Sequence, residues 1–442
     1  MADPAVSVTP YWELTFDADG DPDARRRDRL LDGVTRKGVR DLIVFAHGWN
    51  NDRSGATRLY DGFFAPIPRL VPTAKIGYVG VVWPSMRFSD EPIPDFPRAL
   101  AAEMPRRPAL DKDTRHALLE TFPGRATVID QIARMLDQQP REEAELEEFG
   151  RLVRMLVDVV PPGPQALFAA DTLCEGVPQD SPDMLSGSVA AACKEFAQAL
   201  TLLESPDGAP DGAASFSLPN PWEGAHELLR QATYYAMKRR AGTVGERGLG
   251  RVIGQLAARE PEVRVHLVGH SFGARLVSFA LRGLPKGVRT VKSVTLLQGA
   301  FSHYAFASRL PHDARAGGVL EGQHKRIDGP LVCCYSRHDS ALSTMYPLAS
   351  RMAGDARGVA AQGIGRMLGD KWGALGHDGV QAVPGTKSLK LADALEGKLP
   401  TSGCVNIDAA AVVRRGGAPA GAHSDIVHRE LAQVVLAAGR VK

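Results

Sequence analysis

Six short apolar runs, each bounded by turn residues, most constrain how this chain of 442 residues can fold. They span residues 42–46, 76–83, 263–268, 291–297, 331–335 and 404–410. Runs of this length and character are typical of strands that are buried on both faces of a parallel sheet. Because helical patterns separate most of them, the sequence predicts an α/β fold with helices covering both faces of the sheet. An early segment, 11–16, can add an antiparallel strand at one edge.

The stretch 87–240 differs, because it has no convincing strand pattern. Its helical segments are 115–122, 126–138, 141–160, 188–203 and 222–240. Apolar residues recur at helical spacing in the third of these segments. We therefore interpret 87–240 as a helical insertion between two strands of a core formed by 1–86 and 241–442. A second, smaller insertion is expected at 352–386, a Gly-rich stretch with little strand character.

The run 263–268 leads directly into Gly269-His270-Ser271-Phe272-Gly273, and a helical pattern follows. This GxSxG pattern is common by chance, but its position between a strand and a helix is the setting that a nucleophilic serine needs. Glycine is required on both sides because the turn crowds its own backbone. The sequence thus predicts Ser271 as a nucleophile, with Gly269 and Gly273 allowing the turn.

A serine hydroxyl needs a base, and the base needs an orienting acid, and both are expected downstream of Ser271. Asp339 follows the run 331–335, at the sheet edge where Ser271 is expected. The alternatives are Asp408, within a later strand, and Asp378. The predicted base is His423, which follows the last strand and precedes a helix expected to begin with Ser424 as N-cap and Asp425 in its first turn. His428, one turn into that helix, is the alternative.

Negative charge that develops on a substrate oxygen needs backbone N–H donors. One is expected from Phe272, the residue after the nucleophile. The second is expected from Trp49, in the loop after the first core strand, where Gly48 permits close approach of the backbone. His47 is expected to hold this loop by hydrogen bonding.

These residues resemble the α/β-hydrolase superfamily, of the esterase and lipase type. The matching stretches are His47-Gly48-Trp49-Asn50, Gly269–Gly273, Ser336-Arg337-His338-Asp339 and His423-Ser424-Asp425. The resemblance covers about residues 11–86 and 241–442. It implies a mostly parallel sheet of eight strands, a Ser–Asp–His triad and a cap formed by 87–240. We recognise no particular cap in that insertion, which falls earlier in the chain than the common cap position.

No cofactor or metal is expected. Gly248-Leu249-Gly250 precedes a strand instead of following one, and His226-Glu227 lacks the second histidine of a zinc-binding helix. Basic and acidic side chains nearly balance, 53 against 51, which gives no reason to expect nucleic acid as a partner. The five cysteines form no CxxC pair, and neither a secretory signal nor a membrane-spanning run is apparent. A cytoplasmic protein with small buried cysteines is the expectation.

The leading functional hypothesis is a serine esterase that acts on a small-molecule ester through an acyl-enzyme. An amidase or peptidase with the same triad is an alternative, and a non-catalytic relative that binds a ligand or protein is another. Tyr234, Tyr235 and Met237 can line an acyl pocket or pack a helix. The oligomeric state, the natural substrate and any motion of the insertion leave no signal in the sequence.

Overall fold

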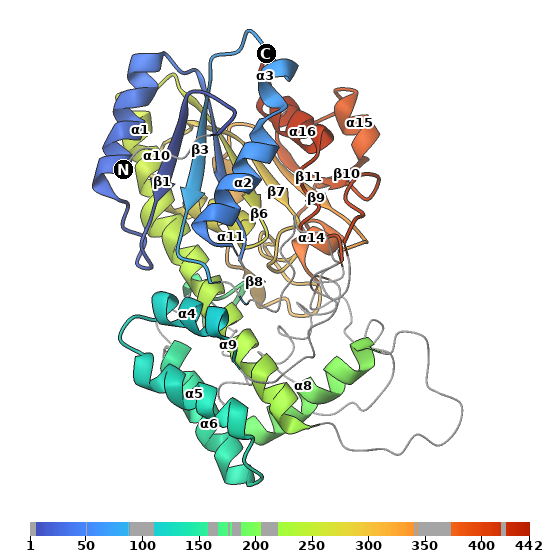
Figure 1. The fold of residues 1–442 in the computed structure, drawn as a ribbon. Helices are drawn as coiled ribbons and strands as arrows, with labels where there is room; N and C mark the ends of the chain where they lie inside the picture. The colour runs from blue at the N-terminus through green and yellow to red at the C-terminus, as the bar shows by residue number, and fades with distance from the viewer. Residues whose placement is uncertain are drawn as a thin grey trace.

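An eight-stranded parallel sheet forms the centre of the computed structural model (Figure 1). The structure describes residues 6–49, 51–86, 88, 110–157, 167–175, 177–178, 187–204, 220–339, 342, 373–416 and 421–442. In spatial order the strands are β1 (Tyr11–Thr15), β3 (Ile76–Val82), β2 (Asp41–Ala46), β6 (Arg264–His270), β7 (Val291–Leu297), β9 (Pro330–Tyr335), β11 (Gly403–Asp408) and β10 (Lys387–Lys390). Each neighbouring pair is parallel, which confirms the predicted α/β architecture.

The two edge strands were predicted least well. β1 was expected to be antiparallel, but it pairs in parallel with β3. The reason is α1 (Ala24–Lys37), which carries the chain back along the sheet so that β1 and β2 point the same way. β10, with the sequence Lys-Ser-Leu-Lys, was not predicted because it has no apolar run. Its lysines lie at an edge, where charge discourages pairing with another chain.

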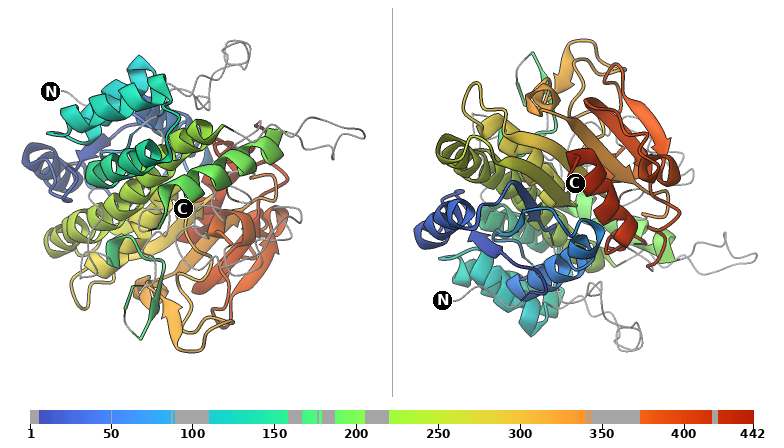
Figure 2. Two further views of the ribbon diagram at one scale, coloured as in Figure 1. Left: turned by 90° about the horizontal axis from the view of Figure 1, so that it is seen from below. Right: turned by 90° about the horizontal axis from the view of Figure 1, so that it is seen from above.

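Helices cover both faces of the sheet, and each face has its own apolar core (Figures 1 and 2). One face is covered by α1, α10 (Gly250–Arg259) and α11 (Phe272–Gly283). The other face is covered by α2 (Arg53–Phe64), α3 (Ile67–Leu70), α15 (Leu391–Leu395) and α16 (Arg429–Gly439). The central strands β2, β6, β7 and β9 are almost entirely buried, as their apolar runs predicted.

The helices of the predicted insertion gather beyond the carboxyl ends of the strands (Figure 1). They are α4 (Lys112–Thr121), α5 (Ala126–Gln138), α6 (Glu143–Val157), α8 (Val189–Glu204) and α9 (Pro221–Thr243), each close to its predicted segment. The expectation that 87–240 lacks strands was wrong. β4 (Thr172–Cys174) and β5 (Val177–Pro178) pair with β8 (Ala316–Gly318) in a small antiparallel sheet. Strands of two or three residues are too short to show a periodic pattern.

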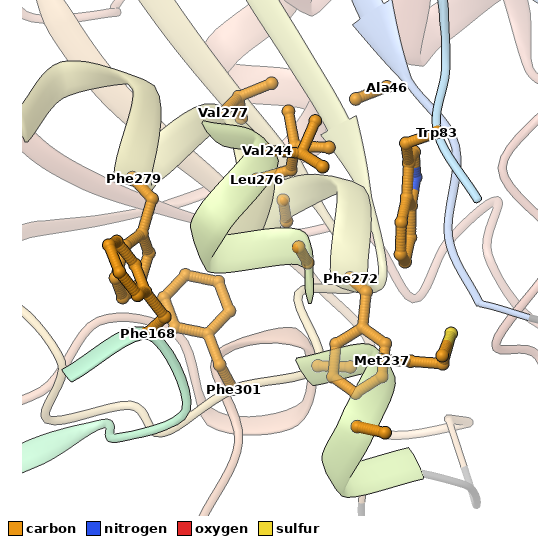
Figure 3. Close-up of a cluster of buried hydrophobic side chains, with 14 of the residues drawn as sticks. Ala46, Trp83, Phe168, Met237, Val244, Phe272, Leu276, Val277, Phe279 and Phe301 are labelled. Atoms are coloured by element: carbon orange, nitrogen blue, oxygen red, sulfur yellow. The ribbon is translucent and has the colours of Figure 1, made fainter. Parts of the chain in front are cut away.

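α9 does not end at residue 240. Its helical backbone continues through a π-helical segment, η3 (Val244–Leu249), into α10. Figure 3 shows part of the core formed where this long helix packs on α11, with Phe272, Leu276 and Met237 among the buried side chains. A continuous helix therefore joins the insertion to the core. The division between the insertion and the core at residues 240 and 241 stays a prediction.

A buried ion-pair network ties the insertion to α11. Arg275 is fully buried, and its guanidinium pairs with the carboxylate of Asp171. Nζ of Lys238, on α9, lies 2.9 Å from the same carboxylate. Arg275 also donates to the carbonyls of Phe168 and Ala170. Removing Asp171 would leave two buried cations without their counter-charge, which costs about 3–5 kcal/mol. These contacts fix the segment 168–171 against the helix that follows Ser271.

The remaining elements lie around β9 and β11. η4 (Gln323–Arg326) precedes β9, and α14 (Leu375–Asp378) packs beside it. Most of the predicted second insertion, 352–372, lies outside the described residues. α16 begins at Arg429 with His428 as its N-cap residue, so the predicted start at Ser424 was wrong. Asp425 instead accepts hydrogen bonds from the amides of Arg414 and Arg415, which holds 423–428 as a loop.

Candidate active site

Ser271 lies at a sharp turn between β6 and α11. Its backbone has φ 56° and ψ −119°, a left-handed conformation that a residue with a side chain rarely adopts. The flanking positions must be glycine. A Cβ atom at 269 would clash with the carbonyl oxygen of Gly273, and one at 273 would clash with that of Ala46. The backbone strain is concentrated at Ser271. This conformation directs the hydroxyl away from the axis of the strand.

The structure brings three predicted residues together at the carboxyl edge of the sheet. Nε2 of His423 lies 2.9 Å from Oγ of Ser271, and Nδ1 of the same ring lies 2.8 Å from Oδ2 of Asp339. Ser271 follows β6, Asp339 follows β9 and His423 follows β11, so the three residues come from distant parts of the chain. With the carboxylate accepting from Nδ1–H, Nε2 carries the lone pair and can accept the serine proton.

Asp339 is fully buried, and further donors surround its carboxylate. Leu342 donates its backbone N–H to Oδ1 at 3.1 Å. Gln298 donates from Nε2 to Oδ2 at 3.3 Å. Gln298 is also fully buried and has a left-handed backbone, φ 46°, at the end of β7. Sequence reasoning missed this residue, although its place directly after a buried strand of the same edge was a usable signal.

The alternative acids and base have other partners. Asp408 accepts from the backbone N–H of Ala410. The carboxylate of Asp378 lies between two histidines, 2.8 Å from His377 and 3.2 Å from His303. Burial acts to raise the pKa of Asp378, but hydrogen bonds from these histidines hold it well below its usual value. His428 pairs with Asp425. The imidazole that meets Ser271 is thus that of His423, and its acid is Asp339.

The loop after β2 runs directly beside Ser271. A Cβ atom at residue 48 would lie 2.6 Å from Cβ of Ser271, so glycine is needed for this approach. His47 holds the loop as expected: its Nδ1 donates to the carbonyl of Gly48, and its own carbonyl accepts from Nε1 of Trp83. Burial lowers the pKa of His47 to about 4, so the ring is neutral. Trp49 and Phe272 follow the two turns that meet here, while Asn50 lies outside the described residues.

His270 braces the loop that carries His423. Its Nε2 donates to the backbone carbonyl of His423 at 2.9 Å, and the two rings lie 5.1 Å apart. Burial, with a smaller contribution from the charge of His423, lowers the pKa of His270 to about 3. A neutral donor therefore holds the base loop. Nothing in the sequence pattern assigned this role to the second residue of GxSxG.

An aromatic cluster lies on the other side of the nucleophile turn. The ring of Phe272 contacts Tyr234 of α9 at 4.5 Å between centroids, and Tyr234 contacts Trp49 at 5.4 Å. Met237 is completely buried in the core, which favours packing as its role (Figure 3). Tyr235 is partly buried against the same core. Of the three residues suggested for an acyl pocket, Tyr234 is the one in ring contact with Phe272.

The described residues contain no group of His, Cys, Asp or Glu side chains arranged to hold a metal ion. Within the same part of the chain, no helix is long and apolar enough to cross a membrane. All five cysteines are unpaired, and four of them are buried, as the sequence suggested.

Comparisons with models of known protein families, with curated proteins and with solved structures find no match for this chain. The functional assignment therefore depends on the geometry alone.

Proposed function

We propose that this protein is a serine hydrolase of the α/β-hydrolase type that cleaves carboxylic esters through an acyl-enzyme. The observation that carries the proposal is the continuous line of hydrogen bonds from Ser271 through His423 to Asp339, at 2.9 and 2.8 Å. Each separation is within the range for proton transfer or orientation in a ground state. His423 is 152 positions from Ser271 and 84 positions from Asp339 in the chain, yet the three side chains meet in this line. A purely local structural role for any one of them would not require this meeting.

In the proposed reaction, Oγ of Ser271 attacks the ester carbonyl carbon while Nε2 of His423 takes its proton. Asp339 keeps the imidazole in the tautomer that can accept this proton, and it stabilises the imidazolium that forms. The bond to the leaving alkoxy group then breaks, and the alkoxy oxygen takes the proton from Nε2. Water, activated by the same imidazole, releases the acid and restores the serine hydroxyl.

The oxyanion of the tetrahedral intermediate is assigned to the backbone N–H groups of Trp49 and Phe272. Two features support this assignment: the close approach of Gly48 to Ser271, and the position of Phe272 as the first residue of α11. The partial positive charge at a helix N-terminus also favours an anion there. A donor of this kind contributes about 3–4 kcal/mol to the stability of a transition state.

The topology supports the same assignment. Nucleophile, acid and base follow β6, β9 and β11 in chain order, all at one edge of a parallel sheet. This is the order expected of the α/β-hydrolase type. The helices α4, α5, α6, α8 and α9 gather beyond that edge, where we assign them to a cap over the site (Figure 1).

The test is labelling by a fluorophosphonate probe, followed by hydrolysis of p-nitrophenyl esters of rising acyl length and of a matching p-nitroanilide. We expect the folded wild type to take one label, and Ser271→Ala to take none. Ser278→Ala is the matched control, since Ser278 is buried in α11 and its hydroxyl donates within its own helix, to the carbonyl of Ala274. An unlabelled, folded wild type would refute the proposal, whereas preference for the anilide would indicate an amidase.

A further inference from the structure

Helix α9 carries polar groups on a face that is buried. Glu227, Gln231 and Lys238 are all less than 9% exposed. With Tyr234 they are spaced three and four residues apart, which places them along one side of a helix. Two polar atoms on this side are buried and have no hydrogen-bond partner among the described residues: Oε1 of Gln231 and the hydroxyl of Tyr234.

The Tyr234 hydroxyl belongs to the cluster beside the proposed nucleophile. The rings of Tyr234 and Phe272 lie 4.5 Å apart, and Phe272 directly follows Ser271. Trp49 completes the cluster, and within the part of the chain that the structure describes its Nε1 is a second buried donor without a partner. The contacts continue from Trp49 through Phe88 to His226, eight residues before Tyr234 on α9.

Unpaired buried donors are costly, because a donor removed from water without a partner loses about 1–3 kcal/mol. The Tyr234 hydroxyl and Nε1 of Trp49 are both hydrogen-bond donors. An indole nitrogen has no acceptor capacity, and burial raises the pKa of Tyr234 far above its usual value, so its hydroxyl keeps the proton. The presence of two such donors in one aromatic cluster is explained if an acceptor from outside the chain hydrogen-bonds to them.

We propose that Tyr234 and Trp49 donate hydrogen bonds to an oxygen in the acyl part of the substrate, so that the enzyme prefers esters of alkoxy, hydroxy or oxo acids to esters of plain alkyl acids. This inference rests on the proposed esterase function. The leaving oxygen must face Nε2 of His423, whose ring contacts Asp339 and His270. Tyr234 and Trp49 contact Phe272 instead, which assigns their cluster to the acyl part.

The test compares two p-nitrophenyl esters of nearly equal shape, the butyrate and the methoxyacetate, in which one CH₂ is replaced by an ether oxygen. The ratio of their kcat/KM values is measured for the wild type, Tyr234→Phe and Trp49→Phe. Tyr234→Phe keeps the ring and removes only the hydroxyl, while Trp49→Phe keeps an aromatic side chain but replaces the indole with a smaller phenyl ring. Because the greater intrinsic reactivity of the methoxyacetate is the same for every variant, the change in the ratio reports the lost donor.

We expect each variant to lower the methoxyacetate-to-butyrate ratio about fivefold to tenfold, the effect of one hydrogen bond. Tyr234→Phe should also unfold at the same temperature as the wild type or a higher one, since it removes an unpaired buried group. The control is Tyr78→Phe, which changes a buried tyrosine in the core on the opposite face of the sheet and should leave the ratio unchanged.

A ratio that stays within twofold of the wild-type value in both variants would overturn the inference, and so would an equal loss on both esters. Failure of the esterase proposal itself is a separate result, because the wild type would then hydrolyse neither ester.

Discussion

Gln298 and His423 share one oxygen atom of Asp339. Nε2 of Gln298 lies 3.3 Å from Oδ2 of Asp339, and Nδ1 of His423 lies 2.8 Å from the same atom. The second oxygen accepts from the amide of Leu342. The carboxylate is therefore fixed in rotation as well as in position. Gln298 reaches it from a strained backbone, φ 46°, and its amide also donates to the carbonyl of Gly376, which ties the acid to α14.

Replacing Gln298 by Met keeps the length of the side chain but removes its donor. We expect kcat to fall about tenfold with KM little changed, because one hydrogen bond to a charged group contributes about 1.5–3 kcal/mol. The measurement is steady-state hydrolysis of a p-nitrophenyl ester, beside the rate of fluorophosphonate labelling. Gln323→Met, on η4, is the control. An unchanged labelling rate in Gln298→Met would show that Asp339 is held without Gln298.

Asp339→Asn tests the tautomer directly. The amide NH₂ would donate to Nδ1 of His423, so that Nε2 would carry the proton and could not accept one from Ser271. Activity should fall about 10⁴-fold at neutral pH while the fold is kept. A double variant, Asp339→Asn with Ser271→Ala, should be no less active than Ser271→Ala alone, since the residues act as one unit. Additive losses would mean that Asp339 acts independently of the serine.

The central strands and the three residues that meet at the sheet edge were predictable because each leaves a local signal. A strand buried on both faces needs an uninterrupted apolar run, as at 291–297, and a tight strand-to-helix turn needs glycine at fixed positions, as at Gly269 and Gly273. What was missed depends on contacts between distant residues. β4, β5 and β8 are too short to show periodicity, and they form strands by pairing in one small sheet.

The predicted start of α16 and the predicted direction of β1 were wrong for the same reason. Ser424 and Asp425 are good residues for a helix start, but hydrogen bonds to the amides of Arg414 and Arg415 hold Asp425 in a loop. The position of Gln298 after a buried strand was a signal, but it could not be linked to Asp339 until β7 and β9 were known to be adjacent. Local sequence patterns thus predict helices and strands, whereas tertiary contacts determine where these elements begin and which residues meet at their ends.

Gly48→Ala should impair catalysis more than stability. The added methyl group would lie 2.6 Å from Cβ of Ser271, so the loop that carries the amide of Trp49 must move away. Loss of one oxyanion donor lowers kcat about 10²- to 10³-fold. Comparison of kcat with the free energy of unfolding in urea separates the two effects. Gly62→Ala, on α2 and facing the exposed side chain of Val427, is the control and should keep full activity. Equal kcat in the two variants would remove Trp49 from the oxyanion site.

The stability of the protein should decrease in mild acid through His270. Its pKa in the folded protein is lowered to about 3, from an ordinary value of 6.5. Between these values the unfolded chain binds a proton that the folded protein does not, so this contribution is fully present above pH 6.5 and is lost as the pH falls toward 3. The slope is about 1.4 kcal/mol per pH unit for one proton.

The test is the variant His270→Gln, which keeps a donor for the carbonyl of His423 but cannot titrate. Urea unfolding between pH 4 and 7 should show a pH slope smaller by about one proton in this variant than in the wild type. His116→Gln, which replaces a histidine exposed on α4, should not change the slope. Parallel curves for His270→Gln and the wild type would mean that His270 is protonated in the folded protein, and its bond to the base loop would then need another explanation.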